Sequence, residues 1–349
     1  MNSLSIITWN KFKRNPLGVI GLTIIAISCF VSIIGYLILP DSTPYSNKMN
    51  LEIAKQPPGF TTDILFIPND KEKEVGLLEK MIFGQASLFS ETPISSYRKS
   101  SDTLYYFGYD GVHENFLNNA SYKIASRTYF LGTDAFGRDL LSRILIGTRV
   151  SLSVGFISVF ISLFIGVFLG ALAAYFRGRV DAVVMWLINV IWSIPTLLLV
   201  IAITLALGKG FWQVFVAVGL SMWVEVARIV RGEVLSIKEN QYVEAATSLG
   251  YGHVRILLKH ILPNVMGAVI VISAANFASA ILIEAGLSFL GLGAQPPLAS
   301  WGTMIRDHYA FIVMGKSYLA IYPGIAIMLL VLSFVLLGNA IRDALDVKN

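Results

Sequence analysis

The sequence predicts an all-α membrane protein with six transmembrane helices and a long extracytoplasmic loop after the first helix. Of its 349 residues, 55% are hydrophobic and only 14% are charged, whereas soluble chains carry about 25% charged residues. The mean hydropathy is +0.67. The apolar residues gather in charge-free runs long enough to cross a bilayer core, which takes about 20 residues. This composition excludes a soluble enzyme, a disordered chain and a collagen-like chain.

Six of these runs are candidate spans. They cover residues 17–39, 150–176, 182–208, 210–227, 261–283 and 317–341, and Glu225 interrupts the fourth. Pro195 lies inside the third run and predicts a kink there. The first run is longer than the apolar part of a signal peptide, so we expect a retained helix. A seventh run, 285–305, contains glycines and prolines and predicts a loop or a re-entrant segment.

Basic residues close to the span ends predict the orientation. Lys11, Lys13 and Arg14 precede the first span, and the loop after the fourth span is rich in arginine and lysine. We therefore expect both termini in the cytoplasm. Alternation then places residues 40–149 outside, since loops of this length escape the positive-inside rule. The prolines and aromatic clusters of this loop predict a small folded lid.

Few residues are available for covalent or metal chemistry. The chain has one cysteine, Cys29, and four histidines, which excludes a cysteine cluster and leaves little room for a histidine metal site. Residues 310–317 (AFIVMGKS) fit a relaxed phosphate-loop pattern, but bulky residues fill its middle, where a phosphate needs glycines. We expect Lys316 to be an interfacial anchor instead. A membrane-embedded enzyme would need paired His, Asp or Glu residues in the spans, and the sequence has none.

The cytoplasmic loop 228–263 carries the most specific motif. Residues 226–249 suit a helix that Gly250 and Gly252 end, and a second amphipathic helix near 254–262 runs into Pro263. The motif E-A-A-x3-G-x9-H-x-L-P consists of Glu244, Ala245, Ala246, Gly250, His260, Leu262 and Pro263. Its small residues would permit close approach by another protein. The alternative is a plain connector between two spans.

This spacing resembles the signature of importer-type ABC permeases, and His260 followed by Pro263 and Asn264 resembles the dipeptide, oligopeptide and nickel branch. Two further blocks are similar to that branch, LGTDAFGRDLLSR at 131–143 with GTRVSL at 147–152, and EAGLSFLGLG at 284–293. The segment KRNPLG at 13–18 is similar to its C-type subunit. The resemblance covers about residues 9–40 and 130–346, and the loop 40–129 is longer than usual for the branch.

The resemblance implies a type I ABC importer permease fold. It divides the chain into an N-terminal segment with the first helix (1–40), an extracytoplasmic loop with an interfacial helix (41–149) and a five-helix permease core (150–349). The E-A-A loop would dock as a coupling helix into a separate ATPase subunit. A side chain at Gly250 would then clash with that partner and impair coupling more than folding.

The resemblance also implies the assembly. We expect a second homologous permease subunit, two ATPase subunits that bind ATP and magnesium, and an extracytoplasmic substrate-binding protein. This chain itself would bind no cofactor and no nucleic acid, and would perform no covalent chemistry. Its place would be the inner (plasma) membrane of a bacterium, where it contacts lipid.

Four residues are candidates for the translocation path or an outer gate: Glu284, Asp134, Arg138 and Asp139. Glu284 follows a long apolar run, so it should either line the path or pair with a loop arginine such as Arg306. Asp134, Arg138 and Asp139 precede an apolar stripe that predicts an amphipathic helix at the outer interface. An ion-paired anchor is the alternative to a gate at this position.

The predicted function is the membrane subunit of an ATP-driven, binding-protein-dependent importer of oligopeptides or dipeptides. Nickel, glutathione or another small solute stays open as the substrate, because the binding protein usually selects the ligand. A stand-alone secondary carrier is a further alternative. Carriers often show internal repeats and charged midplane residues, but this sequence has no obvious repeat and its spans are almost uncharged.

Overall fold

The computed structural model describes residues 4–69, 72–100, 103–109, 111, 114–118, 121–208 and 210–345. The chain forms two compact units. The helical unit comprises Met1–Ile27, Ser151–Gly293 and Ile327–Asn349, and the mixed unit comprises Ser28–Val150 and Ala294–Ala326.

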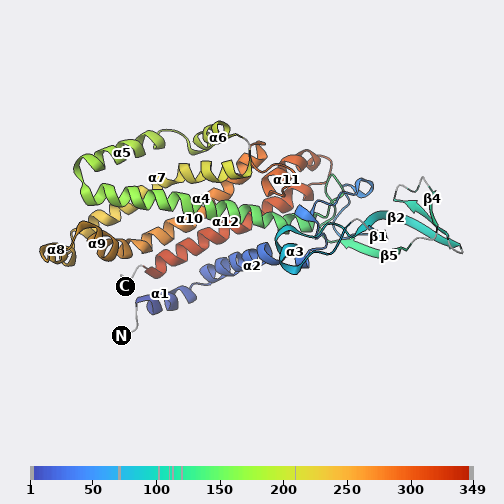
Figure 1. Ribbon diagram of the computed structural model, residues 1–349, viewed down its shortest axis with the longest axis horizontal. Coiled ribbons are helices and arrows are strands. Elements are labelled where there is room, and N and C mark those ends of the chain that lie inside the picture. The colour runs from blue at the N-terminus through green and yellow to red at the C-terminus, as the bar shows by residue number, and fades with distance from the viewer. Residues whose placement is uncertain are drawn as a thin grey trace. The chain divides into compact units, whose positions relative to one another are not determined.

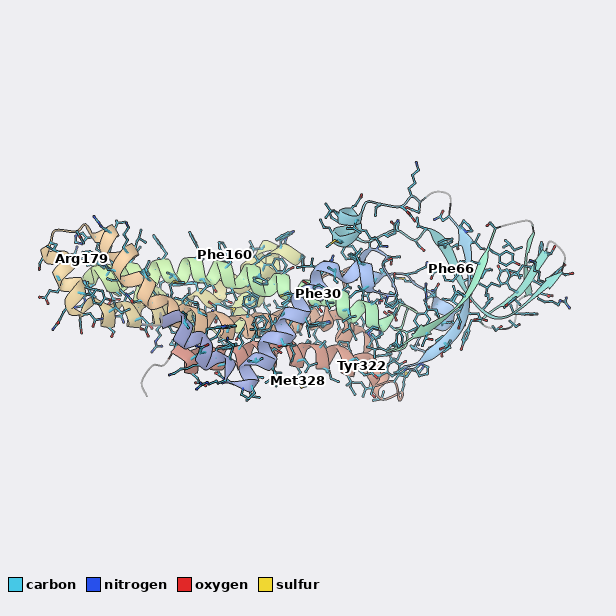
Figure 2. All side chains as sticks on the ribbon, turned by 90° about the horizontal axis from the view of Figure 1, so that it is seen from below. Phe30, Phe66, Phe160, Arg179, Tyr322 and Met328 are labelled. Atoms are coloured by element: carbon cyan, nitrogen blue, oxygen red, sulfur yellow. The ribbon has the colours of Figure 1, made fainter. Side chains whose placement is uncertain are left out.

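Long apolar helices dominate the described part of the chain (Figure 1). Five are long and apolar enough to cross a membrane: α2 (Pro16–Ile38), α4 (Leu140–Phe176), α7 (Phe211–Lys238), the continuous run His253–Phe289 and α12 (Tyr318–Leu345). A short helix, α1 (Leu4–Lys13), precedes them. On α4, large apolar side chains recur at every fourth residue, and all are exposed: Phe156, Phe160 (Figure 2), Phe164 and Phe168. An exposed apolar stripe of this kind marks a membrane or protein contact.

The predicted third span is a bent pair of helices, α5 (Gly178–Trp192) and α6 (Thr196–Leu207). The two axes meet at 93°, which is much sharper than the expected kink. Pro195 explains where the chain turns, because proline lacks a backbone N–H and disfavours the helical conformation of the residue before it. The break falls on residues 193–195.

The interfacial helix predicted before residue 150 is instead the first part of α4, which runs without a break from Leu140. The contacts of Arg149 explain why α4 is continuous although it carries a charged residue at this position. Its guanidinium donates to the carbonyls of Ile33, at 2.9 Å, and Ile82, at 2.9 Å, and lies 4.5 Å from the Tyr36 ring centre. Because these groups compensate the charge of Arg149, α4 can continue through this residue without a break at the membrane surface.

The segment predicted as a lid contains a five-stranded antiparallel sheet, so the all-α prediction was wrong there. The strands are β1 (Phe60–Pro68), β2 (Phe89–Ser100), β3 (Thr103–Gly108), β4 (Glu114–Asn118) and β5 (Lys123–Tyr129), in the order β4-β3-β2-β1-β5. The helix α3 (Leu77–Phe83) joins β1 to β2. These strands are rich in β-branched and aromatic residues, which favour a pleated sheet.

Both faces of this sheet carry a hydrophobic cluster. Ile64 packs with Ile53 and Tyr129 on one face, and Leu65 packs with Ile94 and Leu104 on the other. Successive side chains of a strand point to opposite faces, so the adjacent Ile64 and Leu65 serve separate cores. Phe66 of β1, labelled on the sheet in Figure 2, borders the first cluster.

The connector after α7 differs from the predicted single helix over 226–249. The chain breaks at residues 239–240, and a separate helix, α8 (Gln241–Ser248), follows. The predicted second amphipathic helix is continuous with the next span. It comprises α9 (His253–Ile256), a π turn η3 (Leu257–Ile261) and α10 (Leu262–Phe289).

The remaining elements are short. The 3-10 turns η1 (Pro44–Ser46) and η2 (Leu51–Ile53) precede the sheet, and α11 (Trp301–His308) and η4 (Tyr309–Ile312) precede α12. The predicted loop over 285–305 is a loop only between Phe289 and Trp301. The phosphate-loop-like segment 310–317 follows a helix, and the Nζ of Lys316 donates to the Lys55 carbonyl at 3.0 Å.

Candidate coupling and transport sites

The helix α8 lies beside α9 in the helical unit (Figure 1), and it is anchored there by one face. Val243 and Ala246 are buried in a cluster that includes Ile237 of α7. Residues three apart share a helix face, so a single stripe anchors the connector. Glu244 and Ala245 are exposed. Of the motif E-A-A, the glutamate and the first alanine are therefore presented outward, and the second alanine packs inward.

Gly250 ends α8 in a left-handed conformation with φ of +78°. Its N–H donates to the Thr247 carbonyl at 2.9 Å, and the N–H of Tyr251 donates to the Ala246 carbonyl at 3.2 Å. These two bonds form a Schellman motif, in which glycine is favoured because it has no Cβ. A Cβ at Gly250 would meet no atom of this chain within 4 Å. The predicted clash would therefore have to come from a partner.

The connector continues into α10 through the remaining motif residues, which are His260, Leu262 and Pro263. A proline ring collides with the carbonyl four residues earlier in a regular α-helix, and the π turn η3 widens the helix just before Pro263. His260 lies in this turn and stacks on Tyr251 with ring centres 5.9 Å apart. The carbonyl of His260 accepts a 2.7 Å hydrogen bond from Nδ2 of Asn264. Leu262 packs against the cluster that anchors α8.

Apolar side chains are exposed beside the connector. Leu249 is 73% exposed, Val254 is 70% exposed and Leu258 is 57% exposed. Exposed apolar side chains that gather on one surface mark contacts with a membrane or another protein. The connector thus combines a buried anchor, a backbone-defined end and exposed apolar side chains.

Two of the predicted outer residues, Asp134 and Arg138, lie in a buried ion-pair network of the mixed unit. The Asp134 carboxylate accepts hydrogen bonds from the backbone N–H of Phe136 at 2.8 Å and from Nε of Arg138 at 2.6 Å. Nε of Arg143 lies 3.6 Å from the same carboxylate. Nη1 of Arg138 also donates to Oδ1 of Asn47 at 2.8 Å. Since all three ionic groups are buried and interact with one another, this geometry favours the ion-paired anchor over an exposed gate.

Asp139 caps the N-terminus of α4. Its carboxylate accepts from the backbone N–H of Ser142 at 2.9 Å and from the Ser142 hydroxyl, the pattern of an N-cap residue. The Ser142 hydroxyl in turn accepts the N–H of Asp41 at 3.1 Å. Burial raises the pKa of the Asp139 carboxyl, while the two bonds from Ser142 oppose that shift. Asp139 therefore fixes the start of a helix.

A histidine of α11 completes the anchor in the mixed unit. His308 is buried, its Nδ1 is 2.6 Å from the Met304 carbonyl, and its Nε2 is 3.3 Å from the backbone nitrogen of Ala135. Nε2 must be unprotonated to accept from the Ala135 N–H, so Nδ1 carries the proton and donates to Met304. Burial lowers the pKa of His308.

Glu284 is buried near the end of α10. Ser288, one turn later, donates to its Oε1 at 2.7 Å. The chain after α10 folds back over this turn, since the N–H groups of Leu292 and Gly293 both donate to the Leu287 carbonyl. Arg306, the loop arginine considered as a partner, donates to Asp307 at 2.9 Å.

The sequence-based list of path residues missed Glu225. This residue lies in the middle of α7, is exposed, and lines a cavity of about 270 Å³ in the helical unit. The signal was available, because Glu225 is the charge that interrupts the fourth apolar run. An ionisable residue within a span is a functional candidate by default.

Comparison with known proteins identifies the family. A family model described as "Binding-protein-dependent transport system inner membrane component" matches residues 166–348, which is more than half of the chain. The chain belongs to this permease family. A second family model, "N-terminal TM domain of oligopeptide transport permease C", matches residues 3–58. The predicted branch of ABC importer permeases and its C-type subunit are thereby confirmed.

Relatives of the permease are similar over most of its length. The glutathione transport system permease protein GsiD of Pectobacterium atrosepticum is 40% identical over 254 residues, covering 73% of this chain and 81% of the relative. GsiD of Escherichia coli O6:K15:H31 is 40% identical over 247 residues, covering 71% and 78%. The permease is thus a membrane subunit of an ABC importer and not an enzyme. An importer of this type works with ATPase and binding-protein partners, and its permease is a multi-pass inner membrane protein.

A solved structure shows the same fold. The MetNI methionine ABC transporter in an inward-facing conformation matches with a TM-score of 0.50 at 19% identity, covering 59% of this chain and 97% of that chain. At this identity the likeness shows the fold alone. The predicted type I importer fold is confirmed for the permease core.

Proposed function

We propose that this permease imports short peptides, in the range from glutathione to oligopeptides, by ATP-driven alternating access. The observation that carries the coupling mechanism is α8, which is anchored to α7 and to the α9–α10 run by one buried face and uncovered on the other. A short helix anchored in this way transmits a displacement by a partner to α7 and to the α9–α10 run together. The names of the GsiD relatives and of the N-terminal family model support a peptide-type substrate.

In this proposal the chain has six spans, with α5 and α6 counted as one. Both termini and α8 face the cytoplasm, and the five-stranded sheet faces outward. Two ATPase subunits, a second homologous permease and a binding protein complete the importer. The ATPases bind ATP and magnesium, and this chain binds no cofactor. Glu244 and Ala245 would contact the ATPase surface, and closure of the ATPase dimer would switch the permease from inward-open to outward-open.

Uptake by living cells tests the substrate. Cells that lack this chain are supplied with labelled glutathione, labelled tri- to pentapeptides or nickel, with and without the restored chain. We expect loss of glutathione or peptide uptake, and recovery on restoration. Loss of nickel uptake alone would keep the importer and replace its substrate. Unchanged uptake of all three in cells shown to lack redundant importers would contradict the proposal.

A further inference from the structure

Glu225 occupies an unusual position for a carboxylate. It lies at the midpoint of α7, about 20 Å from either end at 1.5 Å per residue. A charge within a span is costly unless the group faces a cavity or a partner. Glu225 is exposed, and within the described residues it makes no hydrogen bond or ion pair. Its carboxylate is therefore available to a ligand or to a partner group.

The cavity in front of Glu225 has the polarity of a binding site. It lies where the chain bends between α5 and α6, has a volume of about 270 Å³, and is also lined by α7 and α10. The hydroxyl-bearing residues Thr196, Ser221 and Ser279 and the ring of Trp192 line it together with Glu225. Small-molecule sites usually measure about 300–1,000 Å³. This cavity is suited to one end of a longer molecule.

A positive charge lies beside the cavity. Arg228 follows Glu225 by one helical turn, is exposed, and holds its guanidinium 4.4 Å from the centre of the Trp192 ring. The stacking fixes the guanidinium next to one wall of the cavity. The carboxylate of Glu225 and the guanidinium of Arg228 thus lie one helical turn apart on the same side of α7.

We propose that this cavity binds the ammonium end of a peptide-type substrate, with Glu225 as its counter-ion. The hydroxyl groups of the lining accept or donate hydrogen bonds to the first peptide unit, and Arg228 attracts a nearby carboxylate of a short substrate. The inference rests on the proposed peptide function, because it assigns the place in the permease where such a substrate is held. It also gives the exposed charge at the middle of α7 a physical reason.

The first test measures the charge preference of the cavity without any substrate. In the assembled importer, with Cys29 replaced by serine, the Ser279→Cys variant reports access to the cavity. A cationic and an anionic methanethiosulfonate of similar size are compared, each normalised to its rate with a free thiol. We expect the cationic reagent to react about tenfold faster, equivalent to about 1.4 kcal/mol. Glu225→Gln should reduce this ratio towards one.

Glu233→Gln is the matched control, because Glu233 lies on the same helix two turns further and lines a different cavity. It should leave the ratio unchanged. Equal rates for both reagents in the Ser279→Cys variant that retains Glu225, or no effect of Glu225→Gln, would overturn the proposal. Failure of both reagents to react would also overturn it, since a group paired with a second permease or covered by lipid would give that result.

The second test adds the substrate. The binding protein is first saturated with each peptide. A tripeptide with a free amino terminus should then slow labelling of Ser279→Cys in the importer. The N-acetylated form of the same peptide should not slow it. Equal protection by both peptides would contradict ammonium recognition. If the cells import no peptide at all, the proposed function fails. If peptide uptake is normal but protection is absent, only the assignment of the cavity fails.

Discussion

Replacing Gly250 separates two reasons for a glycine in the connector. One is the left-handed backbone conformation, and the other is close contact with the ATPase partner. The residue has φ of +78° at the end of α8, and a Cβ there would meet no atom of the chain within 4 Å. An L-residue in the left-handed region costs about 1–2 kcal/mol, which changes a local equilibrium by a factor of about 5–30. We expect Gly250→Ala to loosen the end of α8 to this extent without unfolding the permease.

The assay is transport-coupled ATP hydrolysis by the reconstituted importer, with uptake measured in parallel. Gly250→Ala should lower coupled uptake several-fold, and Gly250→Val should lower it further because a β-branched side chain fits this region poorly. Gly250→Asn should be milder, since asparagine tolerates the left-handed region. Gly252→Ala is the matched control, because Gly252 has φ of −65° and equally open surroundings.

The order of the variants decides between the two reasons. If Gly250→Asn is worse than Gly250→Ala, side-chain volume and hence a clash with the ATPase matters more than backbone strain, and the reasoning from φ is refuted. If Gly250→Val inserts normally and transports at the wild-type rate, neither reason holds.

Three further predictions concern the mixed unit. Gly137→Ala should destabilise it by about 2–5 kcal/mol, because φ is +70° and a Cβ would collide with the Asn50 carbonyl oxygen; thermal unfolding of the purified importer measures this. Asp139→Ala should cost about 0.5–2 kcal/mol by removing the N-cap of α4, detected as faster hydrogen exchange in its first turn. The lowered pKa of His308 means that the unfolded chain binds a proton before the folded one does. The contribution of His308 to the free energy of unfolding should therefore be constant above a pH of about 6.5 and decrease as the pH falls below that value.

Each of these predictions has a matched comparison. Gly76→Ala has open surroundings and a negative φ, so a similar loss there would show that the Gly137 effect is not steric. Asp139→Ser retains a capping oxygen and should exchange at nearly the wild-type rate. His308→Gln should flatten the acid-side pH dependence of unfolding, and an unchanged slope would assign that dependence to other groups.

The positions of the long helices could be read from the sequence because their cause is local. A run that crosses a bilayer must be apolar over a fixed length, and the predicted runs 17–39 and 317–341 nearly coincide with α2 and α12. Pro195 and Gly250 also act on their own backbone, so a turn could be placed at each of them. The degree of bend at Pro195 could not, because packing of the two halves determines it.

The five-stranded sheet escaped prediction for a different reason. Its strands become stable only when they pair with one another across the chain, as β1 does with β5. The start of α4 was misjudged likewise. Charged residues before an apolar stripe suggested a separate interfacial helix, but Arg143 and Arg149, in the first turns of α4, find acceptors on residues far away in the sequence.

The sequence by itself determined the membrane class, the family and the motif of the connector, since apolar run length, residue spacing and glycine conformation are properties of neighbouring residues. Only the tertiary structure decided what the charged residues do. It buried Asp134 and Arg138 in one ion-pair network and placed Asp139 as a helix cap. It also left Glu225 facing a cavity at the middle of α7. The energy of a charge depends on which groups surround it in space, and residues distant in the chain supply those groups.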